Sequence, residues 1–336
     1  MKKFLLSLMA LGCALTGQAQ ATTDAMKAVL QHGDQVSVFN GANAYVSALT
    51  AAVDGDVITL SEGQFAAAHI TKAVSIYGAG YENDAETGTA VTCINGNFSI
   101  GVAGDTLGNV HMEGLYLNGT ITAGHYPSYN WQVPLKGLTF EKCWIQQTLS
   151  MSGYIENLTF KQCVLMNGVS RSGCTNMLVT NCILFGQLSG APANCETLVD
   201  HSISATTYSG SSGQSITWTN SIFATGAVPI CGPYSVVKNC IKQSNLNLPL
   251  NTTTYENIYD VASIADIFAD AENTSYSAER TWELQQPDVW IGTDGTQVGI
   301  HGGIGWSKAP RTPVIKSLEL NVVGSQLRIS YEAEAR

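Results

Sequence analysis

Residues that could move a proton or hold a negative charge are scarce in this 336-residue chain, of which 12% is charged. One residue separates His111 from Glu113, so on a β-strand both side chains would lie on the same face. A histidine, a carboxylate and a nearby cation are groups that general acid–base catalysis uses. We therefore consider His111, Lys161 and Arg171 as candidate catalytic residues. The structural alternatives are an ion pair between Lys161 and Glu141 and a turn-capping role for Arg171.

Three aromatic residues lie close together in one segment of the chain. Tyr126, Tyr129 and Trp131 follow His125 within seven residues. Aromatic rings contact the apolar C–H face of a sugar ring, while neighbouring polar groups fix its orientation. We predict that these four residues bind a polysaccharide or a cell-surface glycan. The alternative is that the segment folds back and buries the rings.

Motifs for metals and nucleotides are missing from the sequence. Zinc-ligand spacing, a phosphate-binding glycine loop, a dinucleotide fingerprint and a nucleophile elbow are all absent. We assign no residue as a metal ligand from the sequence. Glu82, Asp84 and Glu86 alternate in a short segment and could offer carboxylate oxygens to Ca²⁺, but a solvated acidic loop is the preferred interpretation.

Composition and the first residues predict an exported protein. The formal net charge is -10 and the basic residues are not clustered, which excludes a nucleic-acid binder. Residues 1–21 join Lys2 and Lys3 to a short apolar stretch and an Ala-x-Ala-like end, which is typical of a signal peptide. No later segment is apolar for long enough to span a membrane. We expect a monomer that is secreted, periplasmic or on the cell surface.

The elements that must position these residues follow from a repeat in the middle of the chain. Its steps are 19 or 20 residues long, and each unit pairs an apolar residue with a Cys or Ser three positions later. A fixed period of this length with short β-type runs indicates a solenoid, in which units too small to fold alone stack on one another. We predict a right-handed parallel β-helix with three short strands per coil. The aligned pairs are Phe140 and Cys143, Phe160 and Cys163, Val179 and Cys182, Val199 and Ser202, Trp218 and Ser221, and Val237 and Cys240.

The residue before each Cys or Ser predicts a bend between two strands. Asparagine adopts the left-handed backbone conformation more readily than most residues, and the position is rich in Asn. Alternation then directs Phe160 inward and Lys161 outward. Because Ser replaces Cys in the aligned position, we expect buried free thiols, although neighbouring coils about 4.8 Å apart would also permit a disulfide. The bend positions are Lys142, Gln162, Asn181, His201, Asn220 and Asn239.

Both ends of the solenoid should be covered, because a bare terminal coil would expose core and strand edges. A short helix is also expected near residues 260–271. The predicted domains are a signal peptide over 1–21, a β-helix domain over 22–311 and a β-hairpin tail over 312–336. Within the domain we predict an N-terminal capping helix at about 42–53, repeats at about 56–245 and a closing region at about 246–305.

Several of these segments are similar to known β-helix proteins. Asp54–Phe65, Ile76–Gly80 and the Asn-Cys repeats resemble the pectin-lyase-like right-handed β-helix superfamily. Ile267–Asp270 and Thr293–Gly303 resemble the closing region of secreted right-handed β-helix proteins from gut-type Bacteroidetes. Together the resemblances span residues 40–305. Lyases of this superfamily abstract a proton beside a uronate with Arg or Lys, often with Ca²⁺, so the resemblance implies such roles for Arg171 or Lys161.

The same superfamily includes hydrolases, esterases, adhesins and members without activity, so the fold does not fix the function. An outward row of neutral serines, at Ser150, Ser170 and Ser189, favours binding of polysaccharide or another cell-surface ligand without catalysis. The first alternative is a pectate-lyase-like polysaccharide lyase, or a glycoside hydrolase, acting on an acidic polysaccharide. The second is a structural or adhesin-like surface protein. Convergence of Arg171, Lys161 or His111 with acids in one cleft would favour an enzyme.

Overall fold

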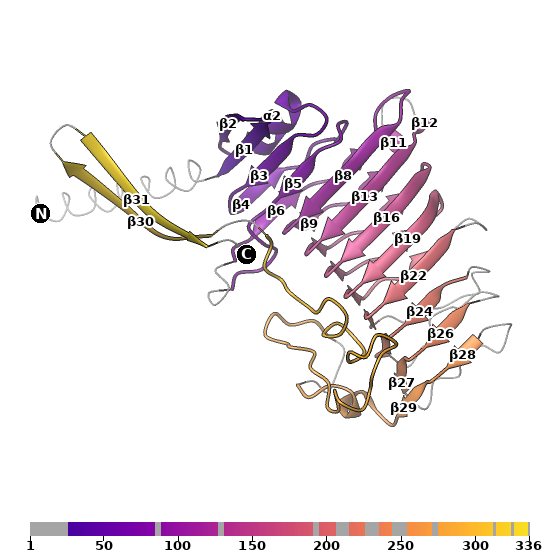
Figure 1. The fold of residues 1–336 in the computed structure, drawn as a ribbon. Helices are drawn as coiled ribbons and strands as arrows, with labels where there is room; N and C mark the ends of the chain where they lie inside the picture. Colours follow the sequence, from indigo (N-terminus) through magenta and orange to yellow (C-terminus); the bar gives the residue numbers. More distant parts are fainter. Residues whose placement is uncertain are drawn as a thin grey trace, which may run out of the picture.

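Coils of short strands stack along one axis, and their mostly parallel pairing builds three sheets that form the predicted right-handed β-helix (Figure 1). The computed structural model describes residues 26–84, 89–126, 131–190, 195–205, 215–225, 235–243, 254–270, 275–311, 314–323 and 326–334. In the middle part of the solenoid, each coil contributes one strand to each of the three sheets, as the repeat predicts. Among the described residues, none of the helices combines the length and the apolar character needed to cross a membrane.

In the middle coils, the longest strand of each repeat lies in the twelve-stranded sheet, which is called here the long sheet. In spatial order its strands are β2 (Gln35–Asn40), β1 (Lys27–His32), β3 (Val57–Leu60), β5 (Ser75–Tyr77), β8 (Leu107–Glu113), β13 (Leu135–Glu141), β16 (Ile155–Lys161), β19 (Cys174–Thr180), β22 (Glu196–Asp200), β24 (Thr217–Thr219), β26 (Val236–Lys238) and β28 (Thr254–Glu256). From β3 onward the pairing is parallel, so equivalent positions of successive coils form rows along the axis.

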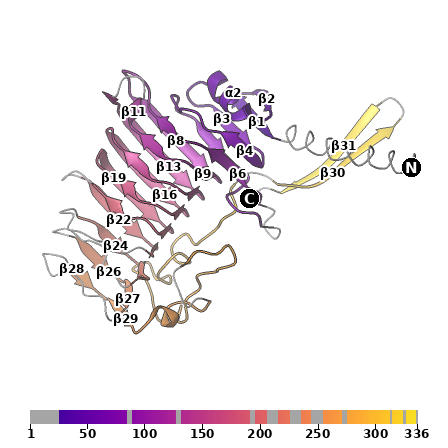
Figure 2. The same ribbon diagram turned by 180° about the vertical axis from the view of Figure 1, so that it is seen from behind.

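The two remaining sheets contain the other strands of the coils (Figure 2). The ten-stranded sheet runs β29 (Tyr259–Val261), β27 (Ile241–Gln243), β25 (Ile222–Phe223), β23 (Ile203–Ser204), β20 (Ile183–Leu184), β17 (Val164–Leu165), β14 (Trp144–Ile145), β9 (Tyr116–Asn118), β6 (Thr92–Asn95) and β4 (Gly63–Ala66). The five-stranded sheet runs β21 (Leu188–Ser189), β18 (Val169–Ser170), β15 (Leu149–Met151), β10 (Ile121–Ala123) and β7 (Phe98–Ile100). Ser150, Ser170 and Ser189 pair across it as the predicted serine row.

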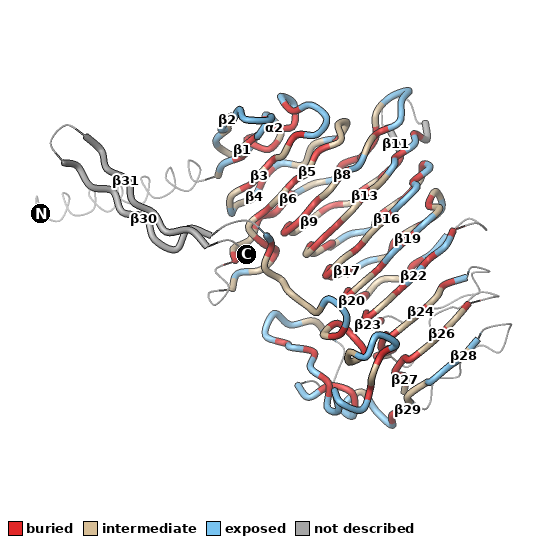
Figure 3. The backbone as a smooth tube through the Cα atoms, in the orientation of Figure 1, coloured by how far each residue is buried: buried red, intermediate tan, exposed pale blue. Residues whose placement is uncertain are grey.

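The interior is a set of apolar rows, seen as the buried red stretches that alternate along the strands in Figure 3. The Phe140 and Phe160 rings are fully buried and stack with centroids 5.4 Å apart. The described cysteines are all buried and free, which confirms the thiol prediction for them; Cys231 lies outside the described residues. Burial raises the pKa of Cys174 to about 12, so this thiol is unreactive at neutral pH.

The bend prediction is confirmed. The six predicted bend residues have φ between 44° and 53°, in the left-handed region: Lys142, Gln162, Asn181, His201, Asn220 and Asn239. Asn257 continues the row at φ 50°. Because these residues leave the strand at a sharp angle, their side chains point out of the solenoid at the corner between the long sheet and the ten-stranded sheet.

The N-terminal coil is covered by more structure than the sequence indicated. Helix α2 spans Ala44–Ala51, inside the predicted 42–53, and buries Tyr45 and Leu49 on the first coil. Strands β1 and β2 form an antiparallel hairpin that the sequence analysis missed, and β1 also pairs antiparallel with β3. An antiparallel partner at this edge blocks further parallel stacking.

The closing region packs on the outside of the ten-stranded sheet and builds a second core there. The predicted helix at 260–271 is wrong: only a 3₁₀ turn, η1 (Ile264–Asp266), forms between β29 and the following irregular chain. The reason is packing, since Ile267 and Phe268 are needed as buried side chains of this core. Its members include the outward row Ile183, Ile203, Ile222 and Ile241 together with Phe268, Trp282, Trp290 and Ile300.

Residues 291–311, called here the strap, then run back along the bend corner toward the N-terminal coils (Figure 1). Bend side chains dock it coil by coil. Their strap partners are Ile291 O for Asn239 (3.0 Å), Thr293 Oγ1 for Asn220 (3.1 Å), Thr296 Oγ1 for His201 (3.1 Å), Ile300 O and Gly302 O for Asn181 (2.8 and 2.7 Å), Gly305 O for Gln162 (2.9 Å) and Ala309 O for Lys142 (2.6 Å). Gly302 is required here, because a Cβ would lie 2.5 Å from His201 Cδ2.

Beyond the strap, β30 (Val314–Val323) and β31 (Gln326–Glu334) form the predicted antiparallel tail hairpin. Both views show it apart from the stacked coils (Figures 1 and 2). The predicted signal peptide at residues 1–21 lies outside the described residues.

Candidate functional site

The outer face of the long sheet carries two adjoining features, a cluster of charged side chains and an open groove. The cluster lies at the carboxyl ends of β8, β13 and β16. The groove crosses β16, β19, β22 and β24. Strand β16 belongs to both, so the two features are neighbours on one face.

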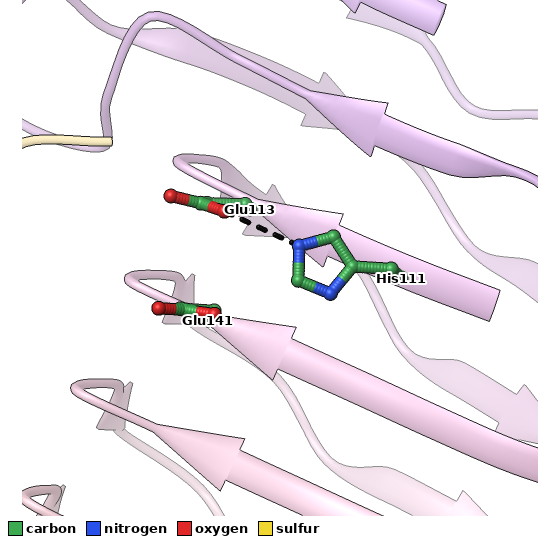
Figure 4. A group of neighbouring side chains, drawn as sticks. All are labelled: His111, Glu113 and Glu141. Atoms are coloured by element: carbon green, nitrogen blue, oxygen red, sulfur yellow. Dashed lines mark hydrogen bonds and ion pairs between the residues drawn. The ribbon is translucent and has the colours of Figure 1, made fainter. Parts of the chain in front are cut away.

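Glu113 and Glu141 form the centre of the cluster, because they occupy paired positions on β8 and β13. Figure 4 shows the two carboxylates on neighbouring coils, with the His111 ring directed at Glu113. His111 Nε2 lies 3.2 Å from Glu113 Oε2. Lys161 Nζ donates to Glu141 Oε1 at 2.8 Å, which is the pairing expected from the repeat.

A residue from the far end of the chain completes the cluster. The Arg311 backbone N–H donates to Glu113 Oε1 at 2.9 Å, and its Nη2 donates to Glu141 Oε1 at 2.7 Å. Glu113 is fully buried and Glu141 is 4% exposed. The last residue of the strap therefore closes both carboxylates off from solvent.

The environment stabilises the charged form of Glu113. Burial alone would raise its pKa, but the hydrogen bonds from His111 and the Arg311 amide and the charges of Arg311 and Lys142 outweigh burial and lower it. Reciprocally, the charges of Glu141 and Glu113 raise the pKa of Arg311. Glu113 is thus an ionised anchor for the strap, with one hydrogen-bond partner at each carboxylate oxygen.

The ligand atoms of His111, Glu113 and Glu141 lie within 4.8 Å of one another, which is close enough for one metal ion to contact all three. However, Lys161 and Arg311 both pair with Glu141, and Arg311 Nε also lies 3.9 Å from Glu113 Oε1. A divalent cation would have to enter beside two fixed positive charges, which is electrostatically unfavourable. We therefore assign the cluster to the docking of the strap.

The three predicted catalytic residues do not meet at one point. His111 and Lys161 both reach the carboxylate cluster, with side chains 23% and 28% exposed. Arg171 lies in the interior, fully buried, where Nη1 donates to Thr197 Oγ1 at 2.6 Å and Nη2 to Leu188 O at 3.4 Å. Its guanidinium ties neighbouring coils together from inside and does not reach the outer face.

The groove has a volume of about 950 Å³ and is lined by two rows of outward side chains. In the first row Asn176 Nδ2 donates to Asn157 Oδ1 at 3.3 Å, and Glu196 pairs with Asn176 in register. In the second row Leu178 and Leu198 are neighbours, 37% and 38% exposed. Thr159, Thr217 and Ser215 complete the described outward lining.

The predicted aromatic site falls in an insertion between β10 and β13. Strands β11 (His125–Tyr126) and β12 (Trp131–Gln132) form a short antiparallel hairpin, with Tyr126 paired to Trp131. Tyr129 lies outside the described residues. The prediction that these residues bind sugar stays a prediction.

The segment considered for Ca²⁺ is partly engaged in other contacts. Glu82 accepts hydrogen bonds from the Tyr276 hydroxyl and from Lys308 Nζ, so it ties the closing region to the solenoid. Asp84 forms an isolated bridge with Thr89. Glu86 lies outside the described residues.

Two parts of the site were missed by the sequence analysis. The groove residues Asn157, Asn176 and Glu196 share one position of the repeat, so extending the repeat alignment toward earlier positions would have found them. Arg311 carried no such signal. It lies 170 residues from Glu141 in sequence and outside the repeats, and only the path of the strap brings it there.

Acid should weaken the strap's attachment. Because folding lowers the pKa of Glu113 below its ordinary value of about 4.3, protonation favours the unfolded chain. The stabilisation is present above that pH and is lost as pH falls through the lower, folded pKa. The carboxyl of Asp200 is shifted the same way: despite burial, its pKa is lowered, first by the hydrogen bond from His201.

We therefore expect the free energy of unfolding to fall between about pH 5 and pH 3, and Glu113→Gln to be less stable at pH 7 but less sensitive to acid. Denaturant titrations at a series of pH values would measure both. The exposed Glu156→Gln serves as the control, with the pH dependence of the wild type. Parallel curves for Glu113→Gln and wild type would contradict the assignment of Glu113 as an ionised anchor.

Comparison of the chain with protein-family models, curated proteins and solved structures finds no match in any of the three. The chain is a right-handed parallel β-helix with a strap along one corner. Its function must be inferred from the geometry of the long sheet.

Proposed function

We propose that this protein is a secreted β-helix protein that binds polysaccharide, without catalysis, in the groove over β16, β19, β22 and β24. The observation that carries the proposal is the repetition of amide and leucine side chains along that groove. The likeness of several segments to pectin-lyase-like proteins and to secreted Bacteroidetes β-helix proteins supports the secreted β-helix part of the proposal, and the ligand is argued from the groove alone.

The spacing of the groove suits a polymer of sugars. Neighbouring strands lie about 4.8 Å apart, close to the rise of one pyranose unit in an extended glycan. Asn157, Asn176 and Glu196 can therefore meet successive sugars with hydrogen-bonding groups. Leu178 and Leu198 offer apolar surface for the C–H faces of the same rings.

Absence of catalysis is proposed because the two neighbouring carboxylates beside the groove, Glu113 and Glu141, are already engaged, and Glu196 is the one charged residue among the described groove lining. Glu113 and Glu141 are buried under Arg311 and bound by His111, Lys161 and Arg311. A general base must reach the substrate proton directly or through one water. Neither carboxylate is open to a chain lying in the groove.

The enzyme alternative has one observation in its favour. His111 and Lys161 converge with two acids, and both retain partly exposed side chains next to the groove. A lyase or hydrolase acting on an acidic polysaccharide would use them as base and cation. A structural or adhesin-like role, the second alternative, requires neither the cluster nor the groove.

Binding is tested by affinity electrophoresis of the mature protein in gels that contain single polysaccharides. The double variant Asn176→Ala/Leu198→Ala should bind at least about tenfold more weakly, because one hydrogen bond and one apolar contact together contribute more than about 1.4 kcal/mol. Gln35→Ala, at an exposed position of β2, is the control and should bind like the wild type.

A reducing-sugar assay on the same polysaccharides separates binding from turnover. We expect no new chain ends. Release of chain ends that disappears in His111→Ala would replace the binding proposal with the enzyme alternative. Retarded migration that is unchanged in the Asn176→Ala/Leu198→Ala variant would place the binding site elsewhere.

A further inference from the structure

The charge of the groove indicates which class of polysaccharide it takes, and this inference rests on the proposed function. Among the groove-lining residues that the structure describes, Glu196 is the only charged side chain. The others offer amides, hydroxyls and apolar groups. No lysine, arginine or histidine lines the described part of the groove.

Lys161 and Asp200, at the carboxyl ends of two groove strands, are each held by partners outside the groove. Lys161 is bound to Glu141. Asp200 accepts from Thr219 and Asn220 and contacts His201. At the amino ends of β13 and β16, Lys136 and Glu156 each follow one of the paired residues Leu135 and Ile155, so one positive and one negative charge lie at this end of the two strands.

Three stretches of sequence near the groove residues contain no charged residue. Residues 191–194 and 206–214, which immediately precede the groove residues Cys195 and Ser215, contain no Asp, Glu, Lys, Arg or His. The segment 226–234, one repeat later, also contains none.

An acidic polysaccharide would find no partner in such a groove. Carboxylate and sulfate groups are recognised by charge-assisted hydrogen bonds from Arg or Lys. Here a polyanion would meet the Glu196 carboxylate in a chain whose net charge is -10. A neutral glycan needs only the hydrogen bonds and apolar contacts that the groove offers, and Glu196 can accept from sugar hydroxyls.

We propose that the groove binds a neutral polysaccharide, laid along the solenoid axis with its hydroxyls on Asn157, Asn176 and Glu196 and its C–H faces on Leu178 and Leu198. The ligand class is thus a glycan without uronate or sulfate groups.

The test compares neutral and acidic probes in one affinity-electrophoresis panel. The neutral probes are xylan, mannan, galactan, arabinan and mixed-linkage β-glucan, and the acidic probes are polygalacturonate, alginate, hyaluronan and chondroitin sulfate. We expect retardation by at least one neutral probe and by no acidic probe. That retardation should persist in high salt, because no ion pair contributes to it, and should be lost in Asn176→Ala/Leu198→Ala.

A charge-reversal variant makes the specificity itself the readout. Glu196→Lys should bind the neutral probe about tenfold more weakly, by loss of an acceptor, and should gain salt-sensitive retardation by polygalacturonate. Glu62→Lys changes the net charge equally at an exposed position before β4 and should do neither.

The outcomes separate the two proposals. Groove-dependent retardation by an acidic probe in the wild type would overturn the neutral class while leaving the polysaccharide-binding function intact. Absence of retardation by every probe, or retardation that the groove variant does not change, would overturn the function and with it this inference.

Discussion

Replacing Phe160 with alanine is expected to lower the free energy of unfolding by about 3–5 kcal/mol, as large core truncations do. The Phe160 ring is fully buried and stacks on Phe140 with centroids 5.4 Å apart and planes 7° apart. Removing it opens a cavity between two coils, and the stacked backbone cannot close it because parallel pairing fixes the coil spacing on both sides. Equilibrium denaturation would measure the loss.

Thr159→Ala is the matched control for this prediction. Thr159 precedes Phe160 on β16 and points to the outer face, so its replacement should change stability by less than about 0.5 kcal/mol. A loss below about 1 kcal/mol for Phe160→Ala would show that the inward row does not carry the core.

Replacing Asn181 with alanine is expected to loosen the strap and to cost about 2–5 kcal/mol, from two effects. Asn181 is fully buried, and its Nδ2 donates to Ile300 O at 2.8 Å and Gly302 O at 2.7 Å. Without the amide, both carbonyls lose a partner in a buried place. In addition, alanine must adopt the left-handed backbone at φ 50°, which asparagine tolerates better.

Asn181→Gly separates the two effects, because glycine adopts that backbone freely but carries no amide. It should be more stable than Asn181→Ala by about 1 kcal/mol and still less stable than the wild type. Hydrogen exchange followed by mass spectrometry should show faster exchange in peptides from residues 291–311 in both variants. Wild-type protection of the strap in both would contradict the docking role of Asn181.

The sequence predicted the solenoid well because its signal is local and repeated. One position per repeat holds a small buried residue and the position before it a left-handed bend, and both rules recur from Cys143 to Cys240. The chain ends were predicted less well. The β1–β2 hairpin and the reduction of the expected helix at 260–271 to η1 depend on partners distant in sequence.

Among the site residues, too, the contacts set by the repeat were predicted, and those outside it were not. The ion pair between Lys161 and Glu141 followed from the repeat, because equivalent positions on adjacent coils must be neighbours. The interior placement of Arg171 did not follow. It stands one residue after the outward Ser170, at a corner where the chain turns, and only the buried partners Thr197 and Leu188 show that its side chain points inward.

By itself, the sequence determined the right-handed β-helix, the inward rows, the free thiols and the left-handed bends, because alternation within a strand and stacking between coils act at fixed sequence distances. The tertiary structure alone decided what the bend side chains hold and what covers the carboxylates. The strap returns from beyond the last coil, and Arg311 meets Glu113 across 198 residues. No periodic signal encodes such a contact, since it arises from the packing of a non-repeating segment against a repeating one.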